Sequence, residues 1–166
     1  MDAGASTAIV ALVPVEEDVL RALLQVAVDD AAPEEVMATA PGPPGWTDAR
    51  REAFRAYHRG TRAPRGGREV TYAVRREAEV VGAARLVTDA EPGTLEVGLW
   101  LARSRRGQGI ARAVLPELCR RAGELGARRL VARTRASNGA ALSALRGYGF
   151  TLVDASAGTV VGTRRL

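Results

Sequence analysis

Glycines, arginines and the start of a predicted helix come together in one segment, Arg103 to Arg112. Gly107 and Gly109 let the backbone turn tightly, so that several N–H groups can point at one spot. The first turn of the helix behind them carries partial positive charge, and the neighbouring arginines can meet further phosphates. The segment therefore predicts a pyrophosphate cradle, with a simple turn as the alternative.

Two common phosphate-binding motifs do not fit this loop. No Gly-Lys-Ser/Thr follows it, which excludes a nucleotide P-loop. Arg112 stands where the dinucleotide-binding fingerprint needs its third glycine. The loop therefore belongs to neither class.

The elements that must position this loop follow from residue periodicity. β-branched and alternating apolar residues predict strands over 7–15, 70–74, 80–87, 95–101, 130–134, 150–155 and 159–164. Apolar residues at helical spacing predict helices over 16–27, 48–59, 110–125 and 138–146. Thr47 is a predicted N-cap, and Pro116 is expected to kink its helix or to cost it one hydrogen bond. Pro33 and 41–45 are a predicted rigid connector, and 65–67 is a predicted turn. This order predicts an α/β fold, in which a mixed sheet has helices on both faces and three consecutive strands form an antiparallel meander.

Length and composition are those of a soluble globular protein. The 166 residues, 46% hydrophobic and 26% charged, suffice for one domain spanning 1–166 and exclude disorder. A single cysteine, Cys119, and a single histidine, His58, exclude an intrachain disulfide and a zinc cluster, so we expect no metal. No apolar run reaches the length of about 18 residues that a membrane span needs, and the N-terminus lacks a signal-peptide pattern. We therefore expect a cytoplasmic protein that binds no membrane.

The charge is divided unevenly along the chain. All 24 basic residues are arginine; residues 1–54 carry ten acids and three arginines, whereas residues 55–166 carry nine acids and 21 arginines. The basic part favours an anionic partner such as a phosphate-bearing ligand, and the acidic part a cationic one; two solvated faces are the alternative. Aromatic residues make up only 4% and no nucleic-acid-binding motif is present, so we expect no nucleic acid as partner.

Two motifs resemble those of the GNAT acetyltransferases. The pattern Arg106-x-x-Gly109-x-Ala111 follows a predicted strand and opens a helix, as the family's Arg/Gln-x-x-Gly-x-Gly/Ala does. A second signature matches at Asn138-x-x-Ala141, followed by Gly149-Phe150. The preceding strand looks like the branch that contains the ribosomal-protein N-terminal acetylating enzymes, in the residues Glu96-Val97-Gly98-Leu99-Trp100-Leu101. The resemblance implies the GNAT fold, a central, mostly antiparallel, splayed sheet with helices on both faces.

The resemblance also implies acetyl-CoA as donor and direct transfer of its acetyl group to an amine. In the family, loop amides hold the pyrophosphate, the pantothenate arm pairs with the fourth strand, and a strand N–H polarises the thioester carbonyl. Asn138 would hydrogen-bond the cofactor arm, begin its helix as an N-cap, or do both. The implied cofactor-binding residues are Leu99, Trp100, Leu101, Arg106, Gly107, Gln108, Gly109, Ile110, Ala111, Arg112 and Asn138.

The sequence departs from the family at the general acid. Leu145 stands where many members carry the tyrosine that protonates the departing thiolate. Tyr148, three residues later, is a candidate for this acid, although a thiol with a pKa of about 8.5 leaves readily without one. Glu96 is the candidate base, since only a neutral amine attacks; an exposed strand glutamate without a catalytic role is the alternative.

Three further residues have simpler interpretations. His58 lies among arginines on a polar helix, so we expect a solvated surface side chain. Cys119 is expected to pack in the core. Trp100 is expected to line the acceptor pocket, with core packing as the alternative.

Three functions remain as hypotheses. The first is acetylation of a primary amine on a small molecule, an antibiotic or amine metabolite; the acidic first helices favour it, because that region walls the acceptor side in the family. The second, acetylation of a protein N-terminus, predicts an open groove instead of a closed pocket. The third, a non-catalytic acyl-CoA sensor, is suggested by Leu145 at the acid position. Homodimers are common in such folds, and the sequence carries no interface signature.

Overall fold

A computed structural model describes residues 9–39, 41–62 and 68–166, which build one seven-stranded sheet in the order β1-β2-β3-β4-β5-β7-β6. Within this described part, β4 and β5 run parallel and every other neighbouring pair runs antiparallel. The strands are β1 Val10–Pro14, β2 Glu69–Arg76, β3 Glu79–Thr88, β4 Thr94–Leu101, β5 Arg129–Arg135, β6 Thr151–Asp154 and β7 Thr159–Arg165. The predicted mixed α/β sheet and its antiparallel meander, β2 to β4, are confirmed.

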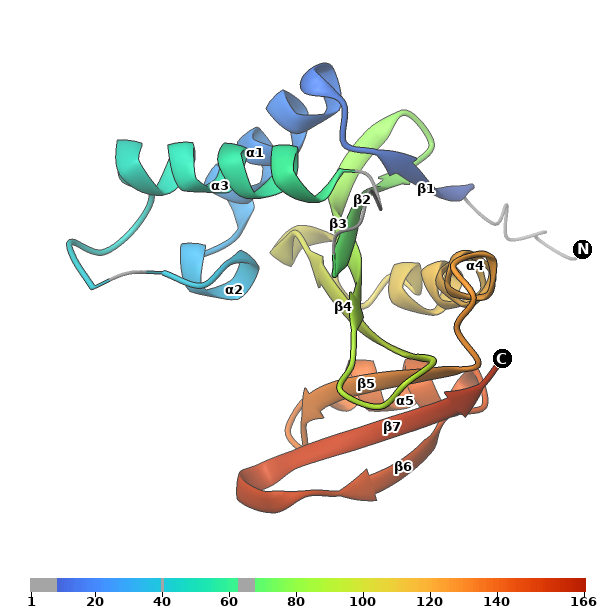
Figure 1. Ribbon diagram of the computed structural model, residues 1–166. Helices are drawn as coiled ribbons and strands as arrows, with labels where there is room; N and C mark the ends of the chain where they lie inside the picture. Colours follow the sequence, from blue (N-terminus) through green and yellow to red (C-terminus); the bar gives the residue numbers. More distant parts are fainter. Residues whose placement is uncertain (1–8, 40, 63–67) are drawn as a thin grey trace, which may run out of the picture.

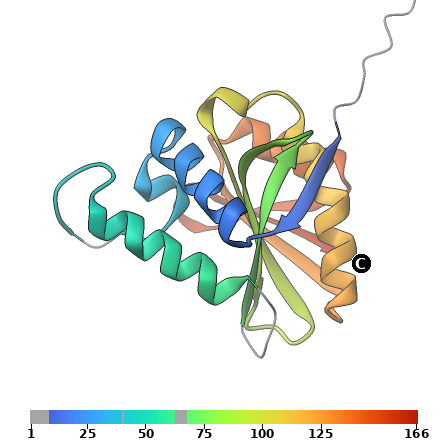
Figure 2. The ribbon, with the colours of Figure 1, turned by 90° about the horizontal axis from the view of Figure 1, so that it is seen from above.

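Helices cover both faces of the sheet, with α1 and α3 on one side and α4 on the other (Figure 2). The helices are α1 Glu17–Asp30, α2 Pro33–Val36, α3 Asp48–Thr61, α4 Ile110–Glu124 and α5 Gly139–Gly147. Thr47 caps α3 by accepting a hydrogen bond from the Arg50 N–H at 3.2 Å, as predicted. The helix α4 runs on through Pro116. The predicted turn at 65–67 and the start of the predicted first strand, residues 7 and 8, lie outside the described residues.

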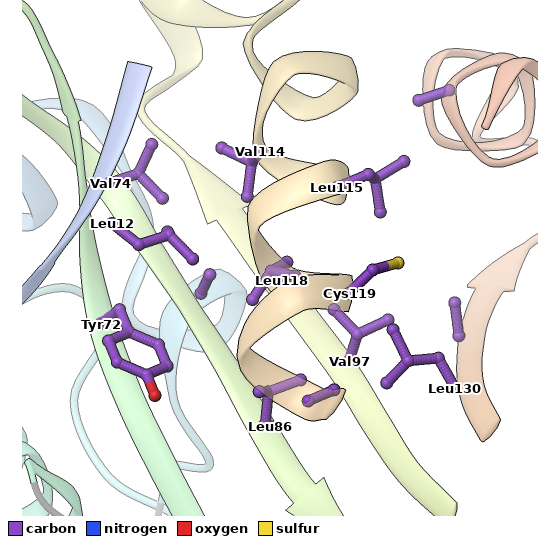
Figure 3. Close-up of a cluster of buried hydrophobic side chains, with 14 of the residues drawn as sticks. Leu12, Tyr72, Val74, Leu86, Val97, Val114, Leu115, Leu118, Cys119 and Leu130 are labelled. Carbon is purple, nitrogen blue, oxygen red and sulfur yellow. The ribbon is translucent and has the colours of Figure 1, made fainter. Parts of the chain in front are cut away.

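Two apolar clusters fill the space on either side of the sheet. The inner face of α4, with Val114 and Leu118, packs against side chains of β1 to β5 (Figure 3). On the opposite face, Leu23 of α1 and Phe54 of α3 pack against small residues of β2 and β3 such as Ala73. The helices α1, α3 and α4 therefore each bury an apolar stripe against one face of the sheet, which is what helical spacing of apolar residues predicts.

The short helix α2 was not expected, because Pro33 was predicted to belong to a rigid connector. Pro33 is instead the first residue of this helix, a position where the missing N–H costs no hydrogen bond. The Glu35 carboxylate accepts a hydrogen bond from the Ala32 N–H at 2.6 Å and closes the first turn. The first helix does break before Pro33, since α1 ends at Asp30, but the prediction of a rigid connector at Pro33 is wrong. The helix α2 places two acidic side chains beside the sheet.

The sheet opens between β4 and β5. These strands pair only over four residues each, Thr94 to Val97 with Arg129 to Ala132. Beyond that point β4 stays paired with β3 as far as Leu101, and β5 with β7 as far as Arg135. The two halves of the sheet therefore diverge, and Figure 1 shows β5 to β7 at a wide angle to β4. The predicted splayed sheet is confirmed.

No helix in the described ranges is long and apolar enough to span a membrane. The same residues contain no group of His, Cys, Asp or Glu side chains that could hold a metal ion.

Candidate functional site: an anion cradle beside a cavity

The loop from β4 to α4 has the geometry of an anion cradle. It leaves β4 at Leu101, makes one short 3-10 turn over Arg103–Arg105, and enters α4 at Gly109, whose φ of 76° is left-handed. No side chain in the described ranges caps this helix N-terminus, and a Cβ on Gly109 would meet nothing there within 4 Å. The first hydrogen bond of the helix runs from the Ala113 N–H to the Gly109 carbonyl oxygen. The N–H groups of Ile110 to Arg112 therefore have no carbonyl acceptor in the preceding loop. Unpaired amides and open space together suit a phosphate group.

Arginine side chains of this loop bind carboxylates of the protein. Arg103 and Arg106 contact the two oxygens of the Glu35 carboxylate at 2.8 and 3.2 Å, and Arg105 contacts Glu79 of β3 at 2.5 Å. Arg106 Nε also donates to the Leu101 carbonyl at 3.1 Å. These guanidinium groups therefore hold the loop onto α2 and β3, whereas the sequence suggested that they face phosphates.

A second contact ties the loop to the end of α1. Both the N–H and the hydroxyl of Ser104 donate to one oxygen of the Asp30 carboxylate, at 3.0 and 2.5 Å. These hydrogen bonds hold the pKa of Asp30 below its usual value. Asp30 and Glu35 therefore link the ends of α1 and α2 to the loop.

The last residues of β4 present a free strand edge at the predicted place. Gly98 to Leu101 pair with β3 on one side and have no β5 partner on the other. The side chain of Leu99 is 36% exposed, and Trp100 is half-buried against the cluster under α1 and α3. An extended ligand can pair with this edge as an added strand.

A half-open cavity of about 560 Å³ adjoins that edge and is bordered by α2, α3, β2, β3 and β4. Leu99 and Trp100 line it, and the role of Trp100 in an acceptor pocket stays a prediction. The other lining residues are Glu34, Glu35, Val36, Met37, Ala38, Tyr57, His58, Thr71, Ala83, Ala84, Arg85 and Gly98.

One wall of the cavity carries a hydrogen-bonded polar network. The Tyr57 hydroxyl donates to the Glu69 carboxylate, and Arg85 contacts the same oxygen at 3.4 Å. Burial raises the pKa of Tyr57, and the neighbouring Glu69 raises it further. The Arg85 side chain lies directly over Gly98, where a Cβ would stand 2.6 Å from its Nε. The absence of a side chain at Gly98 therefore lets Arg85 reach across β4.

His58 is buried, contrary to the prediction of a solvated surface histidine. Its side chain is 1% exposed, with its ring 4.4 Å from that of Phe54 and 5.0 Å from that of Tyr57. Neither ring nitrogen has a hydrogen-bond partner among the described residues. Burial lowers the pKa of His58 to about 4. The spacing of Phe54 and His58, four residues apart on one helix face, was the available signal, and the surrounding arginines obscured it.

The predicted base and acid lie apart from this cavity. The Glu96 carboxylate is bound by Arg133 of β5, which also contacts Asp89 at 3.0 Å. Tyr148 ends α5, and its ring packs under the Arg164 guanidinium at 4.2 Å. Neither Glu96 nor Tyr148 lines the cavity, and the structure does not bring the two together. Their catalytic roles stay predictions.

Asn138 and Cys119 have clear structural roles. Asn138 is the N-cap of α5, and its side-chain oxygen accepts from the Ala141 N–H at 3.1 Å. Its predicted contact with the cofactor arm stays a prediction. Cys119 is buried on the inner face of α4, where burial raises the pKa of its thiol. Leu145 packs in the same apolar cluster, so the position of the family's tyrosine is filled by core.

Solved structures with the same fold include three acetyltransferases. RimJ of Mycobacterium smegmatis, in complex with CoA-disulfide, has a TM-score of 0.75 and 21% identity over 95% of this chain and 82% of its own. The ribosomal L7/L12 alpha-N-protein acetyltransferase RimL, in complex with coenzyme A, has a TM-score of 0.72 and 24% identity over 97% and 96%. The microcin C7 self-immunity acetyltransferase MccE, in complex with acetyl-CoA and AMP, has a TM-score of 0.70 and 12% identity over 95% and 92%.

No curated protein sequence matches this chain. The family model of the acetyltransferase (GNAT) domain matches residues 10–151, from β1 to the first residue of β6. This range holds the cradle, the free β4 edge and all the residues that line the cavity. The chain therefore belongs to the GNAT family of acetyl-CoA-dependent acetyltransferases.

Proposed function

We propose that this acetyltransferase moves the acetyl group of acetyl-CoA to a primary amine of a small molecule. The observation that carries the proposal is the cavity of about 560 Å³ that shares Leu99 and Trp100 with the free edge of β4. Pockets for small ligands typically measure about 300–1,000 Å³. A donor lying along the edge and an acceptor in the cavity would therefore meet at the end of β4.

The donor would be held by backbone more than by side chains. The amides of Gly107 to Arg112 would bind the pyrophosphate at the N-terminus of α4, and the β4 edge over Leu99 to Leu101 would pair with the pantothenate arm. A β4 N–H directed at the thioester carbonyl would stabilise the oxygen as negative charge develops on it. Asn138 would bind the same arm with the amide hydrogens that its capping role leaves unused.

In the reaction, the amine nitrogen attacks the thioester carbonyl carbon and forms a C–N bond. The C–S bond then breaks, its electron pair leaves with the thiolate of coenzyme A, and the nitrogen loses one proton. Because a thiol has a pKa of about 8.5, the thiolate can leave without a protonating side chain. Leu145 in the position of the family's tyrosine is compatible with this route.

Acidic side chains favour a cationic acceptor. Glu34 and Glu35 of α2 both line the cavity, and the Glu34 side chain, 57% exposed and 3.9 Å from Arg50, can attract an ammonium group. Glu35 is already paired with Arg103 and Arg106, so its charge is largely neutralised and its side chain serves mainly as part of the cavity wall.

A protein N-terminus is the second candidate acceptor. It is favoured by one observation, the fold shared with RimL, which is described as an alpha-N-protein acetyltransferase of ribosomal L7/L12. An α-amine has a pKa of about 8, so more of it is neutral at pH 7 than of a lysine-like amine. A short peptide in the substrate panel separates the two candidates.

The test is CoA release from acetyl-CoA with polyamines, aminoglycosides, amino acids and short peptides. Gly109→Trp fills the open cradle and should weaken acetyl-CoA binding at least about tenfold, or 1.4 kcal/mol, by calorimetry. Gly126→Trp is the matched control, since Gly126 has a similar φ of +84° and open space but lies at the far end of α4. CoA release with peptides alone would show that the acceptor is a protein N-terminus and not a small molecule. Equal binding by both variants, or no release with any amine, would overturn the proposal.

A further inference from the structure

His58 is a buried polar side chain whose nitrogens the fold does not use. It lines the proposed acceptor cavity from α3, and Leu99 and Trp100 of β4 line the same cavity. A neutral imidazole has one N–H donor and one nitrogen lone pair, and neither finds a partner in the described part of the chain. Buried polar atoms without partners are rare in folded proteins, and each one calls for an explanation.

Packing alone does not explain an imidazole at this position. The ring lies between the rings of Phe54 and Tyr57, which are apolar contacts that a phenyl ring would satisfy equally well. A phenylalanine would also avoid the cost of burying two unpaired nitrogens. The nitrogens are therefore explained if a ligand in the cavity supplies their partners.

The other titratable groups of the cavity are already engaged. Tyr57 donates to Glu69, Arg85 pairs with Glu69, and Glu35 binds two arginines of the cofactor loop. Glu34 is exposed and lies 3.9 Å from Arg50. His58 is thus the buried group in this cavity whose lone pair is free among the described residues.

We propose that His58 binds the acceptor amine and receives its proton during acetyl transfer, an inference that rests on the proposed function. An N–H of the neutral amine donates to the free imidazole nitrogen, directly or through one water. As the C–N bond forms and the C–S bond breaks, the proton passes from the amine nitrogen to His58, and the electron pair of the C–S bond leaves on the thiolate. His58 then returns its proton to the thiolate or to water.

The surroundings of His58 suit this role. Burial keeps the imidazole neutral at pH 7, so the lone pair is present before the amine binds. The remaining ring N–H can donate to an oxygen atom of the acceptor, which would orient the amine. Glu96, the base predicted from the sequence, has its carboxylate bound by Arg133 outside the cavity and lacks this freedom.

His58→Phe tests the inference, with Thr94→Val as matched control. Thr94 is also a buried polar residue, 3% exposed, but lies at the start of β4 outside the cavity. General-base catalysis typically contributes about 10²–10⁴-fold, so His58→Phe should lower kcat/KM at least about 100-fold. The Kd for acetyl-CoA should stay within about twofold and the melting temperature should not fall, because the phenyl ring leaves no nitrogen unpaired. Thr94→Val should keep the wild-type rate.

A second variant separates binding from proton transfer. His58→Gln keeps a hydrogen-bonding side chain but cannot take a proton, so it should retain KM within about threefold while kcat falls by about 100-fold. This variant also decides the question if His58→Phe fails to fold. Wild-type kcat in either folded variant overturns the inference alone. A wild-type enzyme that acetylates no amine overturns the proposed function and this inference with it.

Discussion

Gly82 of β3 is the residue where adding one methyl group should do most damage to the donor site. It pairs with Leu101 at the end of β4. The next residue, Ala102, donates its N–H to the Val81 carbonyl at 2.9 Å, which holds the end of β4 against β3. A Cβ on Gly82 would collide with the Trp100 carbonyl oxygen and lie 2.9 Å from the Leu101 Cα. Both are backbone atoms, so no side-chain rotation can relieve the clash.

The two strands must therefore separate in Gly82→Ala. Overpacking costs about 1–3 kcal/mol, and losing one backbone hydrogen bond costs about 1 kcal/mol more. We expect the free energy of unfolding to fall by about 3 kcal/mol, which for a chain of this length lowers the melting temperature by about 6–12 °C. The displaced β4 edge should also bind acetyl-CoA more weakly.

Urea unfolding and calorimetry measure both effects. Gly60→Ala is the control: Gly60 lies in α3 with nothing within 4 Å of its virtual Cβ, and this change should raise stability by about 0.5–1 kcal/mol. A Gly82→Ala protein as stable as wild type, with unchanged acetyl-CoA affinity, would refute the close approach of β3 and β4 at the site.

Three more outcomes are expected. The folded-state pKa of His58 is about 4 and the ordinary value is 6.5, so the unfolded chain binds an extra proton between these pH values. Lowering the pH from 7 to 5 should therefore lower the free energy of unfolding of the wild type by about 2 kcal/mol. An equal loss in His58→Phe would contradict this. Asn138→Ala should cost about 1 kcal/mol by removing the α5 cap, whereas Asn138→Ser should keep stability yet weaken acetyl-CoA binding in calorimetry; undiminished binding would exclude the cofactor contact. Glu96→Gln breaks a half-exposed ion pair with Arg133, so it should cost at most about 1 kcal/mol and change turnover less than threefold, and a loss of about 100-fold would make Glu96 the base.

The pH window isolates His58 from the carboxylates. Ion pairs with arginines lower the pKa of Glu17 and of Glu117 to about 2 from an ordinary value of 4.5. Their contribution to stability is complete above the ordinary value and is lost only as the pH falls below it. The stability change between pH 7 and pH 5 therefore reports on His58 more than on these acids.

Much of the fold could be predicted from local patterns. Period-two and period-3.6 apolar residues located the meander β2 to β4 and the helices α1, α3, α4 and α5 within a few residues. Thr47 and Asn138 were identified as N-caps because a cap bonds only two or three residues ahead. Helix α2 was missed, because a proline can both end one helical pattern and occupy the first position of the next helix, as Pro33 does.

The candidate site was predicted where one continuous segment forms it and missed where distant segments meet. The glycine loop before α4 and the β4 edge are adjacent in sequence, so the motif at Arg106 to Ala111 was sufficient to place the cradle. The carboxylates that engage the loop arginines come from Glu35, about 70 residues earlier, and from Glu79. No local pattern reports such pairs, because ion pairing depends on which elements pack together.

The sequence by itself determined most of the secondary structure, the glycine loop before α4 and the family, because these depend on periods, caps and glycine positions within about ten residues of one another. Only the tertiary structure decided the site's chemistry. Docking α3 on the sheet buried His58 with free nitrogens, the end of β4–β5 pairing exposed Leu99 to Leu101, and Arg133 engaged Glu96. Burial and pairing are properties of the packed chain, and the same polar side chain is a solvated group or a reactive one according to what surrounds it.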